Sequence, residues 1–404
     1  MLPLDYHPTG RHFLQIPGPS PVPDRILRAM SLPTIDHRGP EFGALGLRVL
    51  KGLQQIFQTQ HPVMIYPASG TGAWEAALAN TMSPGDRVLM FETGHFATLW
   101  KKMAQRLGLQ PEFLAYQGAD EQLPDAPGWR RGVQADLVEE RLRADKEHSI
   151  RAVCVVHNET STGVTSDIAA VRRAIDAARH PALLMVDTIS SLGSMDYRHD
   201  EWGVDVTVAG SQKGLMLPPG LSFNAVSAKA LAAAERAKLP RSYWDWRPMI
   251  AANETGYFPY TPGTNLLYGL DAAVAMLLEE GLENVFARHD RHAEATRRAV
   301  RAWGLDVQCA EPRHFSSSLT AVRMPAGHSA NAFRAVVLEK FNMSLGNGLG
   351  RLNDKVFRIG HLGDFSDLML VGTLGGVEMG MRAAGVPHRA GGVQAAMDFL
   401  AGNA

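Results

Sequence analysis

A short apolar run that ends in a polar or glycine-rich loop, followed by an amphipathic helix, recurs along this chain from about residue 60. The runs at residues 63–66, 88–91, 152–156, 183–186 and 204–209 predict strands. Short strands that alternate with helices are typical of βαβ units and a mostly parallel sheet. Ligands of such sheets bind at the carboxyl ends of the strands. We therefore expect an α/β fold whose functional site lies in the loops that follow these strands.

The composition is that of a folded protein with balanced charge. The 404 residues include 40 Lys and Arg against 41 Asp and Glu, so the net charge is −1. A nearly neutral chain offers no argument for nucleic acid or an anionic membrane as its main partner. The two cysteines, Cys154 and Cys309, are too few for a disulfide framework and fit a reducing compartment. The first residues lack the apolar core of a signal peptide, so we expect a cytoplasmic protein.

Changes in composition divide the chain into three expected parts. Residues 1–20 are rich in Pro and Gly and predict an extended N-terminal arm. Residues 21–282 hold the repeated strand–loop–helix units and predict a large domain, in which the aromatic segment 230–265 is expected to be irregular. Residues 283–404 predict a smaller α+β domain that begins with an amphipathic helix.

Two chemically versatile residues follow two of the expected strands. Lys213 comes directly after the strand at residues 204–209, where partial burial would lower the pKa of its amine and allow it to form a Schiff base. Asp187 ends the strand at residues 183–186, where a carboxylate can pair with a protonated pyridine nitrogen. Taken singly, Lys213 is more simply a solvated lysine and Asp187 a helix cap. Together they are the pair that pyridoxal phosphate requires to act as an electron sink.

The segment Ser69-Gly70-Thr71-Gly72 separates an expected strand from an expected helix. Glycines let backbone N–H groups approach a phosphate, and the positive end of the helix favours its charge. A tight turn explains the same glycines equally well. The segment lacks the lysine of a nucleotide-binding P-loop and the full G-x-G-x-x-G pattern of a dinucleotide site. A single small phosphate is therefore the ligand that fits it best.

Three further residues are candidates for contacts with a ligand. Phe96 follows a strand and has a ring that can stack on a planar cofactor, while a core aromatic residue is an equal alternative. Thr160 follows another strand, where its hydroxyl either bonds a ligand or closes a turn. Arg358 stands in an apolar strand, so it needs an anionic partner, either a substrate carboxylate or an internal ion pair. The histidines show no metal-binding spacing, and we expect no metal site.

Together, these motifs resemble the class V aminotransferases of pyridoxal phosphate fold type I, in the branch of the alanine–glyoxylate and serine–glyoxylate enzymes. They keep the order of that family and span nearly the whole chain. The segments at 36–38 and 260–270 are most similar to bacterial serine–glyoxylate enzymes. The motifs are Pro-Gly-Pro-Ser (17–20), Ser-Gly-Thr-Gly (69–72), His-Asn-Glu-Thr-Ser-Thr-Gly (157–163), Val-Asp-Thr-Ile-Ser-Ser-Leu-Gly (186–193), Gly-Ser-Gln-Lys-Gly-Leu-Met-Leu-Pro-Pro-Gly (210–220), Tyr-Thr-Pro-Gly-Thr-Asn-Leu-Leu-Tyr-Gly-Leu (260–270) and Val-Phe-Arg-Ile-Gly-His-Leu-Gly (356–363).

The resemblance implies a role for each matching residue of the reacting centre. Lys213 would hold pyridoxal phosphate covalently and then move the α-proton of the substrate. Asp187 would keep the pyridine nitrogen protonated, Phe96 would stack on the ring, and Thr160 would contact the phenolic oxygen. Arg358 would hold the substrate carboxylate.

The resemblance also implies a phosphate site that two subunits share, in a homodimer or a dimer of dimers. Pro21 is a departure, because many relatives carry Asn at this position near the substrate mouth. The transfer of substrate preference is therefore less direct than the transfer of chemistry. The residues expected to bind the phosphate are Thr71, Gly72, Ala73 and Gln212, with Tyr260 and Thr261 reaching the phosphate of the neighbouring subunit.

The implied reaction is a ping-pong transamination through pyridoxamine phosphate, in which L-serine and glyoxylate give hydroxypyruvate and glycine. Alanine or aspartate as the amino donor is the alternative within the same family. The preferred donor, the physiological direction and the choice between dimer and tetramer stay open at this point.

Three other classes fit the residues less well. A cysteine desulfurase of this fold needs a mobile catalytic cysteine, and neither Cys154, in a strand, nor Cys309 has a suitable loop around it. A silent protein that keeps the fold only as a binding module would be expected to lose Lys213 or Asp187. A nucleotide-dependent dehydrogenase would need a complete dinucleotide fingerprint.

Overall fold

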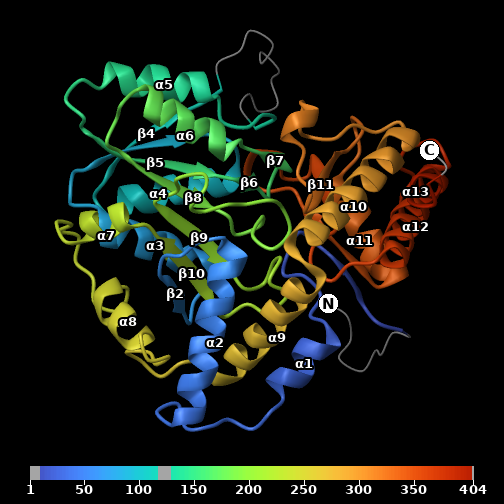
Figure 1. Cartoon of the computed structure of the whole chain (residues 1–404). Coiled ribbons are helices and arrows are strands. Elements are labelled where there is room, and N and C mark those ends of the chain that lie inside the picture. The colour runs from blue at the N-terminus through green and yellow to red at the C-terminus, as the bar shows by residue number, and fades with distance from the viewer. Residues whose placement is uncertain (1–9, 117–128, 403–404) are drawn as a thin grey trace.

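A seven-stranded sheet forms the centre of the larger part of the protein (Figure 1), as seen in a computed structural model that describes residues 10–116 and 129–402. Its strands are β2 (Val63–Tyr66), β3 (Arg87–Phe91), β4 (Gln110–Leu114), β5 (Ile150–Val156), β8 (Leu183–Asp187), β9 (Val206–Gly210) and β10 (Ser222–Val226). They lie in the order β2-β10-β9-β8-β5-β3-β4, and β10 runs antiparallel to both of its neighbours while the other pairs are parallel. The expected α/β fold with a mostly parallel sheet is confirmed.

The five expected strands are all present, and their bounds shift by two residues at most. The expectation missed β4 and β10. Strand β4 lies at the edge of the sheet and carries Pro111 and Glu112, so it has no apolar run. Strand β10 carries the buried polar residues Ser222 and Asn224 between apolar neighbours, which conceals a fully buried strand.

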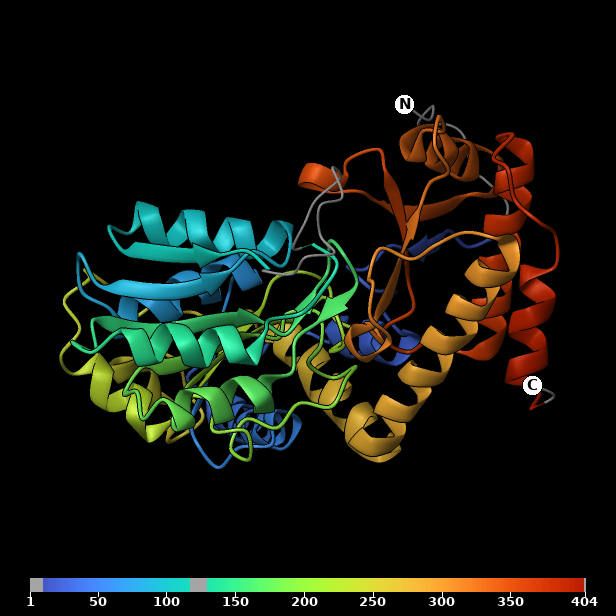
Figure 2. The same cartoon turned by 90° about the horizontal axis from the view of Figure 1, so that it is seen from above.

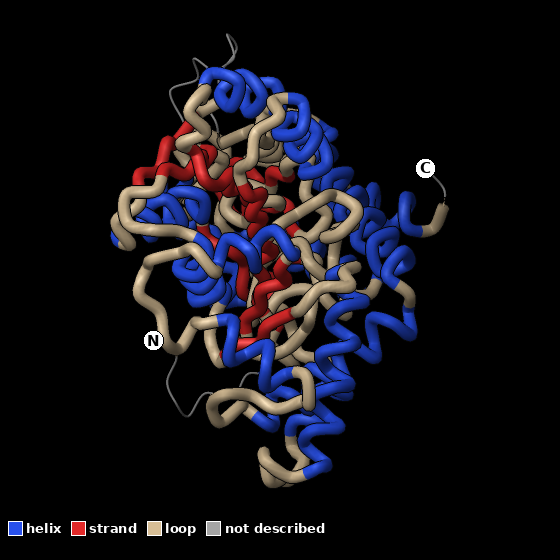
Figure 3. The backbone as a smooth tube through the Cα atoms, turned by 60° about the vertical axis from the view of Figure 1, so that its left-hand side comes forward, coloured by secondary structure: helices blue, strands red, loops and turns tan. Residues whose placement is uncertain are grey.

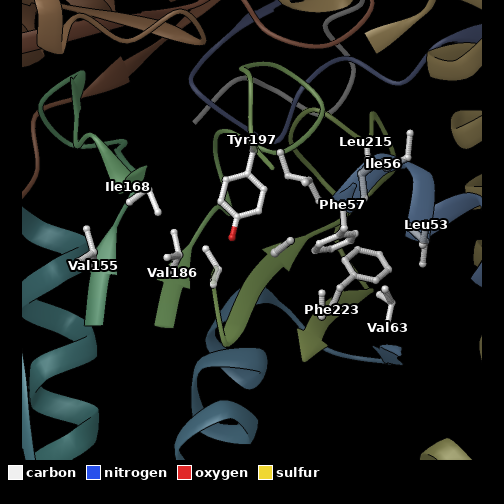
Figure 4. Packing of buried hydrophobic residues seen from close by; sticks show 14 of the residues in the cluster. Leu53, Ile56, Phe57, Val63, Val155, Ile168, Val186, Tyr197, Leu215 and Phe223 are labelled. Atoms are coloured by element: carbon white, nitrogen blue, oxygen red, sulfur yellow. The ribbon is translucent and has the colours of Figure 1, made fainter. Parts of the chain in front are cut away.

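Both faces of this sheet are covered by helices, because alternate residues of its strands point to opposite sides. Val63 and Ile65 of β2 belong to the core on one face, and Met64 and Tyr66 belong to the core on the other. Figure 4 shows part of the first core, where the rings of Phe57 and Phe223 pack against each other. The helices of this face are α2 (Pro40–Phe57), α5 (Ala135–Ala144), α6 (Ile168–Ala177) and α9 (Thr264–Glu280), and α1 (Asp24–Met30) packs on α9. The helices of the other face are α3 (Gly70–Thr81), α4 (His95–Arg106), α7 (Ala228–Ala234) and α8 (Trp246–Asn253).

The aromatic segment 230–265 is more regular than expected, because it contains the end of α7 and the whole of α8. The carboxylate of Asp245 caps α8 by accepting a hydrogen bond from the N–H of Arg247. Trp246 is buried, and its indole N–H donates to the hydroxyl of Tyr66 at 2.8 Å. This tertiary contact fixes the position of α8. The local sequence pattern of the segment does not predict the contact.

The smaller part of the protein is built on a four-stranded sheet in the order β1-β12-β13-β11. Figure 2 shows it beside the larger part, and Figure 3 shows where helices, strands and loops lie along the backbone. Its strands are β1 (Phe13–Gln15), β11 (Leu319–Arg323), β12 (Met343–Asn347) and β13 (Val356–Gly360). Its helices are α10 (Leu282–Trp303), α11 (Ala330–Phe341), α12 (Asp367–Ala383) and α13 (Gly392–Leu400), with short 3-10 turns at Pro312–His314 and Gly350–Leu352.

Within the expected extended arm, Phe13–Gln15 forms β1 and pairs in parallel with β12 of the smaller sheet. The arm as a separate part of the chain stays a prediction. The first nine residues of the arm lie outside the described ranges. The domain boundary near residue 282 coincides with the first residue of α10 and stays a prediction. No described helix combines the length and the apolar character that crossing a membrane requires.

Candidate active site

The loops after five strands of the large sheet meet at its carboxyl edge, because these strands run in the same direction. Backbone hydrogen bonds tie neighbouring loops together. The N–H of His157 donates to the carbonyl of Asp187 at 2.9 Å, and the N–H of Thr188 donates to that of Val208 at 2.8 Å. The expected site residues at this edge are Thr71, Gly72 and Ala73 after β2, Phe96 after β3, Thr160 after β5, Asp187 at the end of β8, and Gln212 and Lys213 after β9.

Lys213 is buried at this edge. Among the lysines and arginines of the described ranges, only Lys213 and Arg358 are buried, at 8% and 6% exposure. The Nζ of Lys213 donates a hydrogen bond to the backbone carbonyl of Pro17 at 2.5 Å. Burial, with a further contribution from the positive charge of Arg358, lowers the pKa of Lys213 to about 7. A large fraction of the amine is therefore neutral near neutral pH, as a nucleophile must be.

Asp187 is a buried carboxylate at the end of β8, with 4% exposure. Its Oδ1 accepts from the N–H of Ile189 at 2.7 Å, and its Oδ2 accepts from the indole N–H of Trp74 at 3.1 Å. Burial raises the pKa of Asp187 to about 7, and these two hydrogen bonds offset only part of that cost. A carboxylate in this condition is strongly stabilised by a cationic N–H partner such as a protonated pyridine.

Helix α3 begins within the glycine-rich segment after β2, and Ser69 at its N-cap makes no side-chain hydrogen bond to the helix. A helix start without a side-chain cap attracts phosphate. The side-chain amide of Gln212 lies at the same place: its Oε1 is buried without a partner, and a Cβ on Gly210 would be 3.1 Å from it and 3.6 Å from the N of Gly70. The expected phosphate-binding residues of the first turn of α3 are Thr71, Gly72 and Ala73.

Phe96 and Thr160 approach the site from two different strands. Phe96 is half-buried in the first turn of α4, so it is not a loop residue, and its N–H donates to the carboxylate of Glu159 at 3.3 Å. Thr160 is buried, and its hydroxyl donates to the Oγ of Ser190 at 2.7 Å. Ser190 lies three residues after Asp187, so the Thr160 hydroxyl stands next to the Asp187 loop.

Arg358 reaches the site from the middle of β13 in the smaller sheet. Its Nε donates to the carbonyl of Asn347 at 2.7 Å, and its Nη1 donates to the carbonyl of Thr160 at 2.7 Å. Burial lowers the pKa of Arg358 to about 10, so the guanidinium is still charged at neutral pH. Within the described residues no carboxylate lies within ion-pair distance of it, so the internal ion pair offered as an alternative is absent there.

Tyr260 and Thr261 lie elsewhere, in the loop before α9. The hydroxyl of Tyr260 donates to the carbonyl of Ile65 in its own chain. Both residues line a surface cavity of about 390 Å³ together with His37 and Arg38. Their expected contact with a neighbouring subunit stays a prediction.

The class V aminotransferase family pattern matches residues 29–348. This chain belongs to that family. It is 48% identical to the L-aspartate–glyoxylate aminotransferase of Paracoccus denitrificans over 96% of both chains. It is also 48% identical to the serine–glyoxylate aminotransferase of Methylorubrum extorquens, over 98% of this chain and 97% of that one. Its structure resembles pyridoxamine–pyruvate aminotransferase from Mesorhizobium loti with a TM-score of 0.88 and 28% identity, covering 99% and 100% of the two chains.

The fold is therefore pyridoxal phosphate fold type I, and pyridoxal phosphate is the cofactor that membership of the class V aminotransferases implies. The residues at the carboxyl edge fit this group. A buried amine of lowered pKa matches its aldehyde, and a buried carboxylate with no ion-pair partner in the described ranges matches its ring nitrogen. An uncapped helix start beside the side-chain amide of Gln212, which can donate through its N–H₂ group, matches its phosphate. Among the described residues, no group of three or more His, Cys, Asp or Glu side chains is arranged to hold a metal ion.

Sequence reasoning assigned no role to three residues that support this class V site. Trp74 donates to Asp187, and the signal for it was available, because Trp74 lies three residues after Thr71 on the same face of α3. Pro17 supplies the carbonyl that holds Lys213. Ser20 fixes the same segment, since its Oγ donates to the carbonyl of Lys213 at 2.9 Å and its N–H donates to the carbonyl of Gln212 at 3.0 Å. Nothing in the sequence pairs these segments.

Proposed function

We propose that this chain transfers the amino group of L-serine to glyoxylate and releases hydroxypyruvate and glycine. The observation that carries the proposal is Arg358, a buried guanidinium held by two backbone carbonyls and aimed at the same edge as Lys213. Serine and glyoxylate each have one carboxylate for it to bind. The full-length similarity to a serine–glyoxylate aminotransferase supports this choice of donor.

In this proposal the residues of the chain divide the work. When bound, pyridoxal phosphate supplies a carbonyl that condenses with amines and a ring that takes up electrons. Lys213 holds the cofactor and, once released, takes the proton from the substrate Cα through its Nζ. Asp187 keeps a proton on the ring nitrogen, with Trp74 and the Ile189 N–H fixing the direction of its carboxylate. Arg358 orients the amino acid and the keto acid through the same carboxylate, so both half-reactions use one geometry.

The remaining contacts are assigned to the cofactor and its surroundings. Phe96 covers the ring, and Thr160 bonds the phenolic oxygen. The phosphate is assigned to Thr71, Gly72, Ala73 and Gln212 of one subunit and to Tyr260 and Thr261 of the other. This sharing makes the active unit a homodimer or a dimer of dimers. The proposed domain organisation is an N-terminal arm (1–20), a large domain (21–282) and a small domain (283–404). The proposed location of the enzyme is the cytoplasm.

A second donor is favoured by a specific observation, the equal identity to an L-aspartate–glyoxylate aminotransferase. Aspartate carries a second carboxylate, whereas Arg358 is the one buried arginine of the described chain and already binds the first. A second cation would have to come from a surface residue or from another subunit.

The test is a comparison of initial rates for the purified holoenzyme with glyoxylate and L-serine, L-alanine or L-aspartate. Glycine and the matching keto acid are measured together. We expect the highest kcat/KM with serine, by about tenfold or more, which corresponds to one good polar contact in the transition state. A higher value with aspartate would replace serine as the donor, and the absence of glycine with every donor would contradict aminotransfer to glyoxylate.

A further inference from the structure

Glu159 is a fully buried carboxylate that sequence analysis left without a role. It lies on a short hairpin formed by β6 (Asn158–Glu159) and β7 (Val164–Thr165), directly after the central strand β5. Its side chain has 0% exposure. A buried carboxylate requires several hydrogen-bond donors, and the identity of these donors shows what Glu159 does.

The donors to Glu159 are at the start of helix α4. Oε2 of Glu159 accepts from the N–H of Ala97 at 3.0 Å, and Oε1 accepts from the N–H of Phe96 at 3.3 Å. Oε1 also accepts from the N–H and the hydroxyl of Ser161, at 3.1 and 2.6 Å. The hydroxyl oxygen of Ser161 in turn accepts from the N–H of His95 at 3.0 Å. The first three N–H groups of α4 are thus bound by one hairpin.

This contact replaces the ordinary cap of the helix. The N-cap residue of α4 is Gly94, which has no side chain to offer. A Cβ at Gly94 would lie 2.4 to 2.6 Å from Cγ and Cδ of Glu159 and Oγ of Ser161. The hairpin and the helix start are therefore packed in direct contact, and a carboxylate at a helix N-terminus also interacts favourably with the helix dipole.

The alternate residues of the same segment bind the rest of the site. Asn158 donates to the Oγ of Ser190 and to the Oγ of Ser318, both at 2.9 Å. Thr160 donates to Ser190 and offers its carbonyl to Arg358. One short segment thus joins the turn that carries Phe96, the loop after Asp187 and the substrate arginine.

We propose that Glu159 is a positioning residue that sets the affinity for pyridoxal phosphate by holding the first turn of α4, and with it the ring of Phe96, in place. Glu159 acts on the cofactor through Phe96 and not by contact. The proposal rests on the role of Phe96 in the proposed function. The proposal adds Glu159 as the residue on which the position of Phe96 depends.

The test is a double-mutant cycle read by cofactor affinity. Glu159→Gln keeps the size of the side chain but puts an N–H₂ group against the N–H donors of α4. Phe96→Leu removes the ring. The Kd of the apoprotein for pyridoxal phosphate is measured by absorbance for the wild type, both single variants and the double variant. We expect about a tenfold increase in Kd for each single variant, the scale of a lost hydrogen bond to a charged group, and about the same tenfold increase for the double variant.

The cycle distinguishes action through Phe96 from a general loss of structure. Asp145→Asn is the matched control, because Asp145 is also a buried carboxylate that accepts from a backbone N–H, that of Ile150, at 2.7 Å, at the opposite edge of the sheet. It should lower Tm and leave the Kd for pyridoxal phosphate unchanged. If Glu159→Gln does not fold, Ser161→Ala takes its place, with an expected rise in Kd of about threefold that is again lost in the Phe96→Leu background.

A double variant with about a hundredfold rise in Kd would show independent effects and overturn the proposal. An unchanged Kd for Glu159→Gln, or for Phe96→Leu, would overturn it as well. The result is separate from the choice of amino donor, because no substrate is present. A wild-type protein that binds no pyridoxal phosphate would instead overturn the proposed function itself.

Discussion

Two buried aspartates at opposite edges of the large sheet show how this protein separates stability from chemistry. Asp187 at the carboxyl edge and Asp145 at the amino edge are similarly buried, at 4% and 6% exposure. Burial is the largest cause that raises the pKa of Asp187, to about 7, and the hydrogen bonds from Ile189 and Trp74 offset only part of it. Burial acts on Asp145 in the same direction, but hydrogen bonds from Ile150, Ser149 and His180 outweigh it and hold its pKa well below the usual range.

The same contrast extends to the other buried charges of the two edges. At the amino edge, Asp205 accepts from the N–H of Leu184 and the hydroxyl of Ser227, both at 2.8 Å, and lies 3.5 Å from the Nζ of Lys229. At the carboxyl edge, the hydrogen bonds of Lys213 and Arg358 within the described residues go to backbone carbonyls. Charges that support the fold, including Glu159 at the carboxyl edge, have hydrogen-bond partners within the chain, whereas Asp187, Lys213 and Arg358 have charged groups available for a ligand.

The largest effect is expected from Lys213→Ala. This variant removes the amine that holds the cofactor and moves the substrate proton, so turnover should fall by on the order of 10⁴-fold or more. Steady-state assays of glycine formation measure it. Appreciable turnover by Lys213→Ala would remove Lys213 from the mechanism.

Asp187→Asn should lower kcat by about 10²–10³-fold, because an amide does not supply the charge that keeps the ring nitrogen protonated. Asp145→Asn is the comparison at the other edge, and its kcat should stay within about twofold of the wild type. An equal fall in kcat for both variants would contradict the assignment of chemistry to the carboxyl edge and stability to the amino edge.

Arg358→Ala should raise KM for the amino acid and for glyoxylate together, by about tenfold to a hundredfold, because both lose the same charge-assisted hydrogen bonds. Arg358→Lys should reverse only part of this rise in KM, since a lysine cannot make bidentate hydrogen bonds to a carboxylate. An unchanged KM for both substrates would make Arg358 a structural residue.

The smallest effects are on the pH dependence of apoprotein stability, and they have opposite signs for the two aspartates. Because the pKa of Asp145 is depressed on folding, its stabilisation is present above the ordinary carboxyl pKa of about 4 and is lost as pH falls below it. Because the pKa of Asp187 is raised to about 7, its ionisation costs stability as pH rises from about 4 to 7.

Thermal unfolding of the apoprotein between about pH 2 and pH 8 measures both slopes. Asp145→Asn should lower stability at pH 7 by about 2 kcal/mol, the scale of hydrogen bonds to a buried charged group. Asp187→Asn should raise Tm at pH 8 and leave it nearly unchanged at pH 4. A fall in Tm at pH 8 for Asp187→Asn would mean that its carboxylate is a stabilising group like Asp145.

Residues that directly follow a strand were predictable from the sequence. The end of a parallel strand fixes the edge on which the next residue lies, which is why Asp187, Thr160 and Lys213 were assigned correctly to one edge. Arg358 was recognised because a charge inside an apolar strand demands a partner. That pattern left two kinds of partner open. The structure shows that no carboxylate in residues 10–116 and 129–402 forms an ion pair with the guanidinium.

Contacts between distant parts of the chain were not predictable. Trp74 lies 113 residues from Asp187, and Pro17 lies 196 residues from Lys213. The pairing of β1 with β12 and the tie between Glu159 and α4 are of the same kind. These contacts depend on how the helices and loops pack on the sheet. Local hydrophobic periodicity does not predict that packing.

The central claim is tested most directly by the visible absorption spectrum of the purified protein before and after L-serine is added without any keto acid. We predict a yellow protein whose visible band is bleached by serine while hydroxypyruvate appears in equal amount, and a Lys213→Ala protein without this response. A band that serine leaves unchanged would contradict serine as the donor. A colourless protein that gains no band on addition of pyridoxal phosphate would contradict the account as a whole.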